Sequence, residues 1–440
     1  MSFTVSTYQN EYLPSGASEV HAVVTVTAGV DEAIGMNADK AVVLIVDTSG
    51  SMSSPGSKIR AARRATSTAV GLIPDGTWFA VIAGSHRAWC VYPPAPAGQW
   101  PELARADART RADGVQVSQQ LPATGGTAIS TWLELARVMF EARPGAIRLA
   151  YLLTDGKNES EPRSNLEAAL ARSTGVFQCD ARGVGVDWNV EELRLITSSL
   201  LGQVELISEP DQMDDDFRDF LERAIGKNVA DVRLRLWAPQ GSKLRFLRQV
   251  TPSIEDLTAK VAAVNALTGD FPTGSWAPGE SRDYHVCIEV PPAEIGDEKL
   301  AGRVSLVVDG EPQSQSLVRA VWTEDMALST RINPHVAHYT GQKELADAIQ
   351  QGLEARKQGD EATATVRLGR AVQLAHESGN EGTVRLLQKV VDVDDPTTGT
   401  VRLRRAVETL DEMALDTRST RTVRVTAKPA GDATGEGEEA

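Results

Sequence analysis

An unbroken apolar run, Ala41–Val46, ends abruptly at Asp47 and is followed by the polar sequence TSGS. Because the run is apolar at every position, it predicts a strand buried on both faces, as in a parallel sheet covered by helices. Open α/β sheets place their ligands at the carboxyl ends of such strands. Asp47, Ser49 and Ser51 alternate there, so they can present three oxygen atoms toward one point. Such a set suits a small hard cation, above all Mg²⁺.

Two later segments can complete such a site. In Ala123–Ser130, ATGGTAIS, Thr127 follows a glycine pair just before a helical pattern. Leu149–Lys157, LAYLLTDGK, is a second apolar strand that ends at Thr154, Asp155 and Gly156. Taken singly, DTSGS could cap a helix, TDG is a common turn and GGT is weaker still. Their joint occurrence in this order, each after a strand or before a helix, favours the metal site.

The combination of DxSxS, GGT and a strand ending in TDG resembles the von Willebrand factor A (VWA) domain over roughly Lys40–Lys227. The resemblance implies a complete metal-ion-dependent adhesion site that holds Mg²⁺, with Mn²⁺ as the alternative. It further implies that an acidic side chain of a protein partner fills the metal's open position. It also implies the ligands: the hydroxyls of Ser49, Ser51 and Thr127, and the carboxylates of Asp47 and Asp155, which bind directly or through water.

The same residues argue against catalysis. An aspartyl-phosphate mechanism needs a second acid two residues after Asp47, and Ser49 stands there. The chain has neither a GxSxG elbow nor a GxxxxGK[ST] phosphate loop. We interpret His335 and His338 as a solvated turn, and His86 with Cys90 as a packed loop. We therefore expect a binding protein and not an enzyme.

Charge and composition limit which kinds of partner and which cell compartment we expect. The net charge of −15 argues against nucleic acid, which needs a basic binding face. No apolar run is long enough for a membrane helix, and the first residues lack the pattern of a signal peptide. Three scattered cysteines, Cys90, Cys179 and Cys287, do not form a disulfide framework. We expect a cytoplasmic protein without a membrane span.

The patterns along the chain predict a doubly wound, Rossmann-like α/β domain inserted in a β-sandwich and followed by a small helical bundle. Strands in residues 1–38 should pair with the later sandwich, because an isolated hairpin is only marginally stable. The expected units are the α/β domain at 39–227, the sandwich at 228–330, the bundle at 331–415 and a disordered tail at 416–440. Helical spacing predicts four bundle helices, at Lys343–Lys357, Glu361–His376, Glu381–Val391 and Val401–Leu415.

The tail places Thr417, Thr420 and Thr422 among arginines. By analogy with bacterial A-domain proteins that accompany Ser/Thr kinases and phosphatases, these threonines are candidate phosphorylation sites for recognition by a forkhead-associated domain. A solvated tail without a role is the alternative.

Two function classes remain from the sequence. The first is a metal-dependent protein-binding module, an adaptor in a bacterial signalling or stress-response assembly. The second is an accessory subunit of an AAA+ ATPase complex of the chelatase type. We favour the adaptor, because the acidic and Pro-rich linkers or degenerate ATPase half of the second class are not evident.

Overall fold

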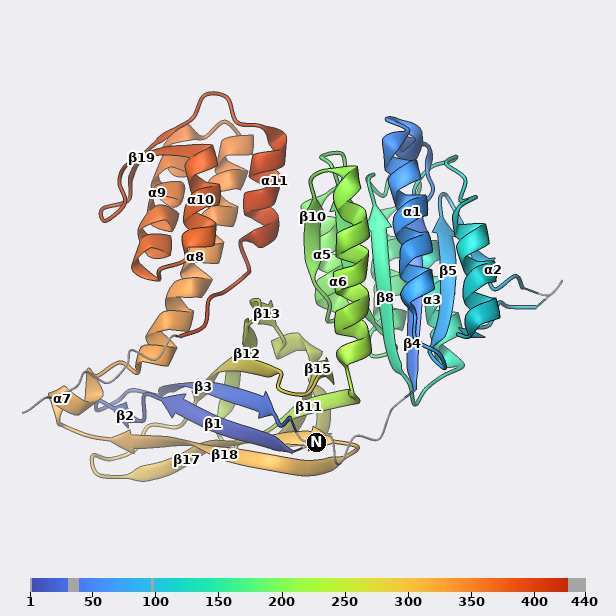
Figure 1. The fold of residues 1–440 in the computed structure, drawn as a ribbon. Helices are drawn as coiled ribbons and strands as arrows, with labels where there is room; N and C mark the ends of the chain where they lie inside the picture. The colour runs from blue at the N-terminus through green and yellow to red at the C-terminus, as the bar shows by residue number, and fades with distance from the viewer. Residues whose placement is uncertain (1, 31–38, 96–98, 426–440) are drawn as a thin grey trace, which may run out of the picture.

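The computed structural model describes residues 2–30, 39–95 and 99–425, which form an α/β domain, a β-sandwich and a helical region (Figure 1). The sheet of the α/β domain has the strand order β10-β9-β8-β4-β5-β6, with β7 also paired to β5. The strands from β10 to β5 run parallel, and β6 and β7 run antiparallel to β5. The strands are β4 (Lys40–Asp47), β5 (Trp78–Gly84), β6 (Ala88–Tyr92), β7 (Ala104–Arg105), β8 (Ile147–Thr154), β9 (Gln178–Val184) and β10 (Val204–Ile207).

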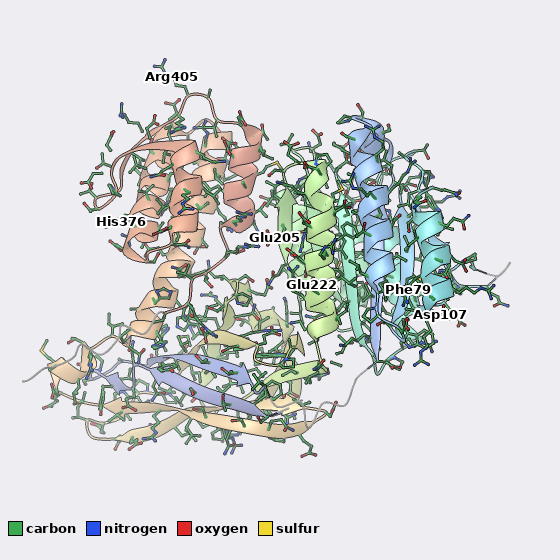
Figure 2. All side chains as sticks on the ribbon, viewed as in Figure 1. Phe79, Asp107, Glu205, Glu222, His376 and Arg405 are labelled. Carbon is green, nitrogen blue, oxygen red and sulfur yellow. The ribbon has the colours of Figure 1, made fainter. Side chains whose placement is uncertain are left out.

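Helices cover both faces of this sheet. One face carries α1 (Ser57–Leu72), α2 (Ala108–Ser118) and α6 (Met213–Gly226), and the other carries α3 (Ile129–Glu141), α4 (Arg163–Ser173) and α5 (Val190–Ser199). Val42, Leu44 and Val46 of β4 pack into the first core, while the residues between them pack into the second. Figure 2 shows Phe79 of β5 beneath α2, where it is fully buried. The predicted doubly wound α/β fold is therefore confirmed.

The sandwich is built from the segments that precede and follow the α/β domain in the chain. Its first sheet has the order β1-β3-β16-β12-β13 and its second β14-β15-β11-β17-β18-β2, with β2 parallel to β18. Residues Val24 and Val286 of the first sheet pack against Leu234, Val304 and Trp322 of the second. The strands are β1 (Phe3–Gln9), β2 (Tyr12–Leu13), β3 (Glu19–Ala28), β11 (Val229–Trp237), β12 (Lys243–Thr251), β13 (Glu255–Asp256), β14 (Ala262–Asn265), β15 (Thr268–Trp276), β16 (Ser281–Glu289), β17 (Glu298–Val308) and β18 (Glu311–Trp322).

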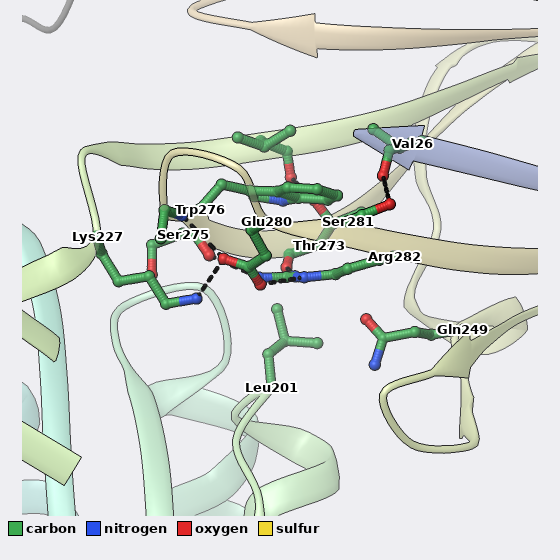
Figure 3. A network of polar contacts seen from close by, with 12 residues as sticks. Val26, Leu201, Lys227, Gln249, Thr273, Ser275, Trp276, Glu280, Ser281 and Arg282 are labelled. Carbon is green, nitrogen blue, oxygen red and sulfur yellow. Dashed lines mark hydrogen bonds and ion pairs between the residues drawn. The ribbon is translucent and has the colours of Figure 1, made fainter. Parts of the chain in front are cut away.

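A polar network joins the α/β domain to the sandwich (Figure 3). Lys227, directly after α6, donates to Glu280 at 2.7 Å, and Glu280 accepts from Arg282 Nε at 2.7 Å. Arg282 also donates to the backbone carbonyl of Ser275 at 2.7 Å. Because these partners are mostly buried and hydrogen-bonded to one another, they fix how the α/β domain meets the sandwich.

The helical region differs from the prediction at its third and fourth helices. It contains α7 (Met326–Ser329), α8 (Pro334–Lys357), α9 (Glu361–Glu377), α10 (Glu381–Val390) and α11 (Thr409–Arg418). The predicted helix Val401–Leu415 is wrong, because its first residues form β20 (Thr400–Leu403), which pairs with β19 (Val391–Asp395). The interpretation of His335 and His338 as a solvated turn at a helix start is correct for the helix start but wrong for the solvation. Both lie in the first turns of α8 and are half-buried, and the ring centroids of His335 and Tyr8 stack at 3.8 Å.

The β19–β20 hairpin forms because its residues alternate with the period of a strand, although their spacing also fits a helix. Val391 and Val393 alternate with aspartates, and Val401 and Leu403 alternate with polar residues, which is the period of a strand. Arginines that a helix would spread around its surface instead pair across the hairpin, Arg402 with Asp394 at 2.7 Å and Arg404 with Asp392 at 3.0 Å. The tip turns at Gly399, whose φ of 69° favours glycine and whose carbonyl packs directly on Gly369 of α9.

The predicted disordered tail at 416–440 is wrong for residues 416–425, and residues 426–440 lie outside the described residues. Asp416, in the last turn of α11, accepts from Arg194 of α5 at 2.8 Å. Arg421 forms a bridge with Ser253 and an ion pair with Glu205 of β10, which faces α11 in Figure 2. Arg424 pairs with Asp283 of the sandwich at 3.1 Å. Residues 419–425, the C-terminal arm, therefore connect the helical region to both other units.

Candidate metal centre

The three segments that the sequence singled out meet at one edge of the α/β sheet. β4 and β8 are parallel neighbours, with Val46 paired to Leu153, so Asp47, which ends β4, and Asp155, which follows β8, lie at the same edge of the sheet. The loop before α3 joins them, because Gly50 N donates to the carbonyl of Gly125 at 2.8 Å. Parallel pairing thus brings together residues that are about a hundred positions apart in the chain.

The two aspartates and the two serines share a chain of hydrogen bonds. Asp47 accepts from the backbone N–H of Ser49 at 2.7 Å and from the hydroxyl of Thr154 at 2.6 Å. The hydroxyls of Ser49 and Ser51 lie 2.8 Å apart, and Ser51 donates to Asp155 Oδ1 at 2.6 Å. Both carboxylates are fully buried. The buried carboxylate oxygens and the two serine hydroxyls therefore converge on one place.

Thr127 completes the set from the third segment. Its backbone N–H donates to Ser160 Oγ at 2.9 Å, which holds it at the start of α3. A Cβ placed on Gly156 would lie 3.3 Å from Ser51 Oγ and 3.5 Å from Thr127 Oγ1. The structure therefore brings the five residues that the resemblance implied to one place. Ser49, Ser51 and Thr127 line a cavity of about 390 Å³, and Asp47 and Asp155 are fully buried behind these hydroxyls. The other lining residues are Gly125, Gly126, Gly156, Lys157, Glu159, Ser160 and Asp187.

The donors fit a hard divalent cation. Burial raises the pKa of Asp47 to about 6, the hydrogen bonds from Ser49 and Thr154 oppose this, and the charge of Asp155 adds to it. Two buried acids beside each other repel, and a divalent cation between them would relieve that repulsion. Mg²⁺ prefers such carboxylate and hydroxyl oxygens and keeps positions for other ligands, so it would supply Lewis acidity toward an external anion.

Comparisons with known proteins bear on this geometry. Residues 42–157 match the model of the von Willebrand factor type A domain, and residues 373–419 match that of the von Willebrand factor type A C-terminal domain. A solved structure described as von Willebrand factor type A from Catenulispora acidiphila is 48% identical, covers 96% of this chain and 97% of its own, and superposes with a TM-score of 0.90. The chain belongs to the von Willebrand factor type A family.

More distant structures share only the fold. The ArnB paralog VWA2 from Sulfolobus acidocaldarius is 15% identical with a TM-score of 0.57, and the match covers 96% of this chain and 100% of that one. The human COPII-coat protein Sec24c is 10% identical with a TM-score of 0.50, over 91% of this chain and 60% of its own. No curated protein matches the sequence significantly. The VWA domain thus sits in a whole-chain arrangement that VWA2 shares.

Lys58 is a site residue that the sequence analysis missed. It lies in the first turn of α1, and its ammonium group is 2.7 Å from Asp155 Oδ2 and 3.7 Å from Asp187. Its side chain is only 9% exposed. The sequence held a signal for its burial. Lys58 is next to Ile59, which belongs to the apolar stripe that packs this helix on the sheet. Lys58 therefore already neutralises one of the two acids that face the site.

Replacing Lys58 with methionine should raise the affinity for Mg²⁺ at least about tenfold, because it removes a positive charge next to a metal ligand. In chelator the same change should lower the free energy of unfolding by about 3–5 kcal/mol, since it leaves Asp155 buried without its partner. Calorimetry and urea unfolding measure the two effects. Lys157→Met, at an exposed lysine on the rim of the same cavity, is the matched control. Equal metal affinity in both variants would contradict the role of Lys58.

The three candidate phosphorylation sites lie in very different surroundings. Thr417 is 2% exposed inside α11, so a kinase could not reach its hydroxyl in this conformation, and its phosphorylation stays a prediction. Thr422 is half-buried and donates to the carbonyl of Val250 at 2.5 Å. Thr420 is half-buried, and its backbone carbonyl accepts from Ile254 at 2.8 Å. Phosphorylation of Thr420 or Thr422, and its reading by a forkhead-associated domain, stay predictions.

Proposed function

We propose that this protein is a metal-dependent binding module whose VWA domain captures an acidic side chain of a partner protein through Mg²⁺. Members of the family generally mediate protein–protein interactions. The observation that supports metal-dependent binding of an acidic side chain is the convergence of five oxygen-bearing residues at the base of an open cavity. These residues are Asp47, Ser49, Ser51, Thr127 and Asp155.

The charge of the site supports an anionic partner. Next to the hydroxyl ligands, Asp47 and Asp155 contribute two negative charges and Lys58 one positive charge, which sums to −1. The exposed charged residues in the cavity lining add a further −1, and they are Asp187, Glu159 and Lys157. A bound Mg²⁺ would change the sum next to the hydroxyl ligands to +1, because the other three ligands are neutral hydroxyls. At the buried base of this open cavity, a positive charge with neutral hydroxyl ligands attracts a carboxylate. Binding, and not catalysis, is the use that this arrangement favours.

The proposal also covers the cell compartment and the cellular role of the protein. We propose an adaptor that works in the cytoplasm of a bacterial cell, within a signalling or stress-response assembly. Cys90, Cys179 and Cys287 are free thiols, which suits a reducing compartment. Within residues 2–30, 39–95 and 99–425, no helix combines the length and apolar character needed to cross a bilayer. A role as an accessory subunit of an AAA+ ATPase stays a prediction without a structural observation to favour it.

Ser51→Ala tests the proposal, because it removes one hydroxyl ligand without changing charge. The variant should bind Mg²⁺ at least about tenfold more weakly in calorimetry. In pull-downs from extract of the source cells, proteins held by the wild type in Mg²⁺ should be absent in chelator and absent with the variant. Ser54→Ala, at an exposed serine three residues on, should behave like the wild type. Equal Mg²⁺ binding by Ser51→Ala and the wild type would overturn the assignment of the site.

A further inference from the structure

A second group of metal-binding side chains lies far from the VWA domain's site, on the first sheet of the sandwich. Glu19 and His21 are alternate residues of β3, so they project from the same face. Cys287 of β16 is the direct cross-strand neighbour of His21. One donor atom from each of the three residues lies within 4.8 Å of the others, and His21 Nε2 is 3.7 Å from Cys287 Sγ.

His285 holds the imidazole of His21 from behind. It stands two residues before Cys287 on the same face of β16, and its Nε2 lies 3.2 Å from Nδ1 of His21. This bond engages Nδ1 and leaves Nε2, the nitrogen that faces Cys287, for another partner. Histidines that bind metals commonly engage their second ring nitrogen in such a bond, which sets the ring's orientation and tautomer. His285 is 5% exposed, so little water competes for this contact.

The donor types select the metal. A thiolate, an imidazole and a carboxylate suit Zn²⁺, whose usual geometry is tetrahedral, with bonds of about 2.0–2.3 Å. Two donors of a tetrahedron with such bonds stand roughly 3.3–3.7 Å apart, and the 3.7 Å between His21 and Cys287 agrees with this spacing. Mg²⁺ avoids thiolates, so this group differs in chemistry from the oxygen site of the VWA domain.

The neighbouring charges allow Glu19 to turn toward a metal. Glu19 now faces Arg245 at 3.5 Å, and Arg245 also faces Glu289 at 3.4 Å. Arg245 would therefore keep one carboxylate partner if Glu19 turned away from it. Both ion pairs are solvent-accessible and long, so giving up one costs little.

We propose that Glu19, His21 and Cys287 bind one Zn²⁺ ion, with water as the fourth ligand and His285 as the residue that orients His21. Binding converts the Cys287 thiol to a thiolate, and its proton passes to solvent. The metal would link β3, which precedes the VWA domain in the chain, to β16, which follows it. Such a link would strengthen the pairing of these two strands of the first sheet, which lie on either side of the inserted domain in the chain, and it is independent of the function proposed above.

Cobalt substitution tests this site on the full-length, reduced protein. Co²⁺ bound to a thiolate gives an intense ultraviolet charge-transfer band, and the oxygen ligands of the VWA domain cannot produce one. The band should appear in the wild type, in Cys90→Ser as the matched cysteine control and in Asp47→Ala, which disables the other site. It should be absent in Cys287→Ser. Because Asp47→Ala keeps the band, failure of one site is distinguishable from failure of the other.

A second measurement covers the case in which Cys287→Ser folds poorly, since Cys287 is 1% exposed. His21→Gln, at a half-buried residue, keeps the thiol and should weaken Zn²⁺ binding at least about a hundredfold in competition with a chromophoric chelator. The Asp47→Ala variant, which keeps Glu19, His21 and Cys287, should gain thermal stability from one equivalent of Zn²⁺. Absence of the cobalt band in the wild type, or its persistence in Cys287→Ser, would overturn the proposal.

Discussion

Replacing Asp47 with asparagine should stabilise the metal-free protein by about 3 kcal/mol near neutral pH and abolish its stabilisation by Mg²⁺. Burial raises the pKa of Asp47 from 3.8 to about 6. A difference of about two pKa units between the folded and unfolded states corresponds to roughly 3 kcal/mol. Asparagine can keep both local contacts, since its oxygen can accept from Ser49 and its amide can donate to Thr154.

The pH dependence of this effect has a definite sign. The folded pKa of Asp47 lies above the unfolded one, so the folded state binds the proton more tightly. The contribution of Asp47 to stability is therefore fully present below about pH 3.8 and is lost as the pH rises through about 6. Urea unfolding in chelator should show Asp47→Asn and wild type nearly equal at the acid end, with the variant increasingly more stable up to about pH 8.

Asp155 provides the matched comparison, because it is equally buried but already paired with Lys58 at 2.7 Å. Asp155→Asn would leave the Lys58 ammonium group without that partner, so it should lower the free energy of unfolding by about 3–5 kcal/mol. Opposite signs for the two substitutions would show that Lys58 compensates one acid and not the other. A pH-independent difference between Asp47→Asn and wild type would contradict the first prediction.

Gly84→Ala should destabilise the VWA domain by about 3 kcal/mol or more and weaken Mg²⁺ binding, although it changes no ligand. Gly84 ends β5, opposite Asp47 on β4, and its carbonyl accepts from the backbone N–H of Thr48 at 2.7 Å. A Cβ at this position would lie 2.3 Å from the ring of Trp132. Trp132 is fully buried in α3, and its indole donates to the carbonyl of Ser85 at 2.8 Å.

The clash at position 84 should weaken metal binding because it displaces α3. Relief of the clash requires Trp132 to move, and Trp132 lies in the first turns of the helix that starts just after Thr127. Chemical unfolding and Mg²⁺ calorimetry measure the two effects. Gly145→Ala is the control, because a Cβ there meets nothing within 4 Å, and it should stay within about 0.5 kcal/mol of wild type.

A second substitution shows whether the clash itself is the cause. Trp132→Leu should lower stability on its own but lower it less in the Gly84→Ala background, since the smaller side chain leaves room for the methyl group. Strict additivity of the two substitutions would contradict the proposed contact.

The VWA fold and the oxygen site could be predicted from local sequence, for a physical reason. A strand buried on both faces must be apolar throughout, as Ala41–Val46 is, and parallel strands bring their carboxyl ends to the same edge. The positions of Asp47, Thr127 and Asp155 therefore follow from short segments and a regular fold. The apolar pattern of β3 likewise predicted a strand that needed partners from the later sandwich.

The rest depended on contacts between residues far apart in the chain. Helical spacing did not reveal the β19–β20 hairpin, because strands of five and four residues carry too few positions to separate the helical period from the strand period. The C-terminal arm has a polar sequence typical of a tail, and only its docking against Glu205 and Asp283 orders it.

The buried ion pair at the oxygen site and the second group of metal-binding side chains show most clearly what only the tertiary structure decides. Lys58 is an ordinary helix residue in sequence, and the position of α1 over the end of β8 is what pairs it with Asp155. His21 and Cys287 are 266 positions apart, and they meet because β3 and β16 pair in one particular register. Local patterns encode which elements form and which edge holds the oxygens. Register and packing, which depend on the whole chain at once, decide which side chains become neighbours.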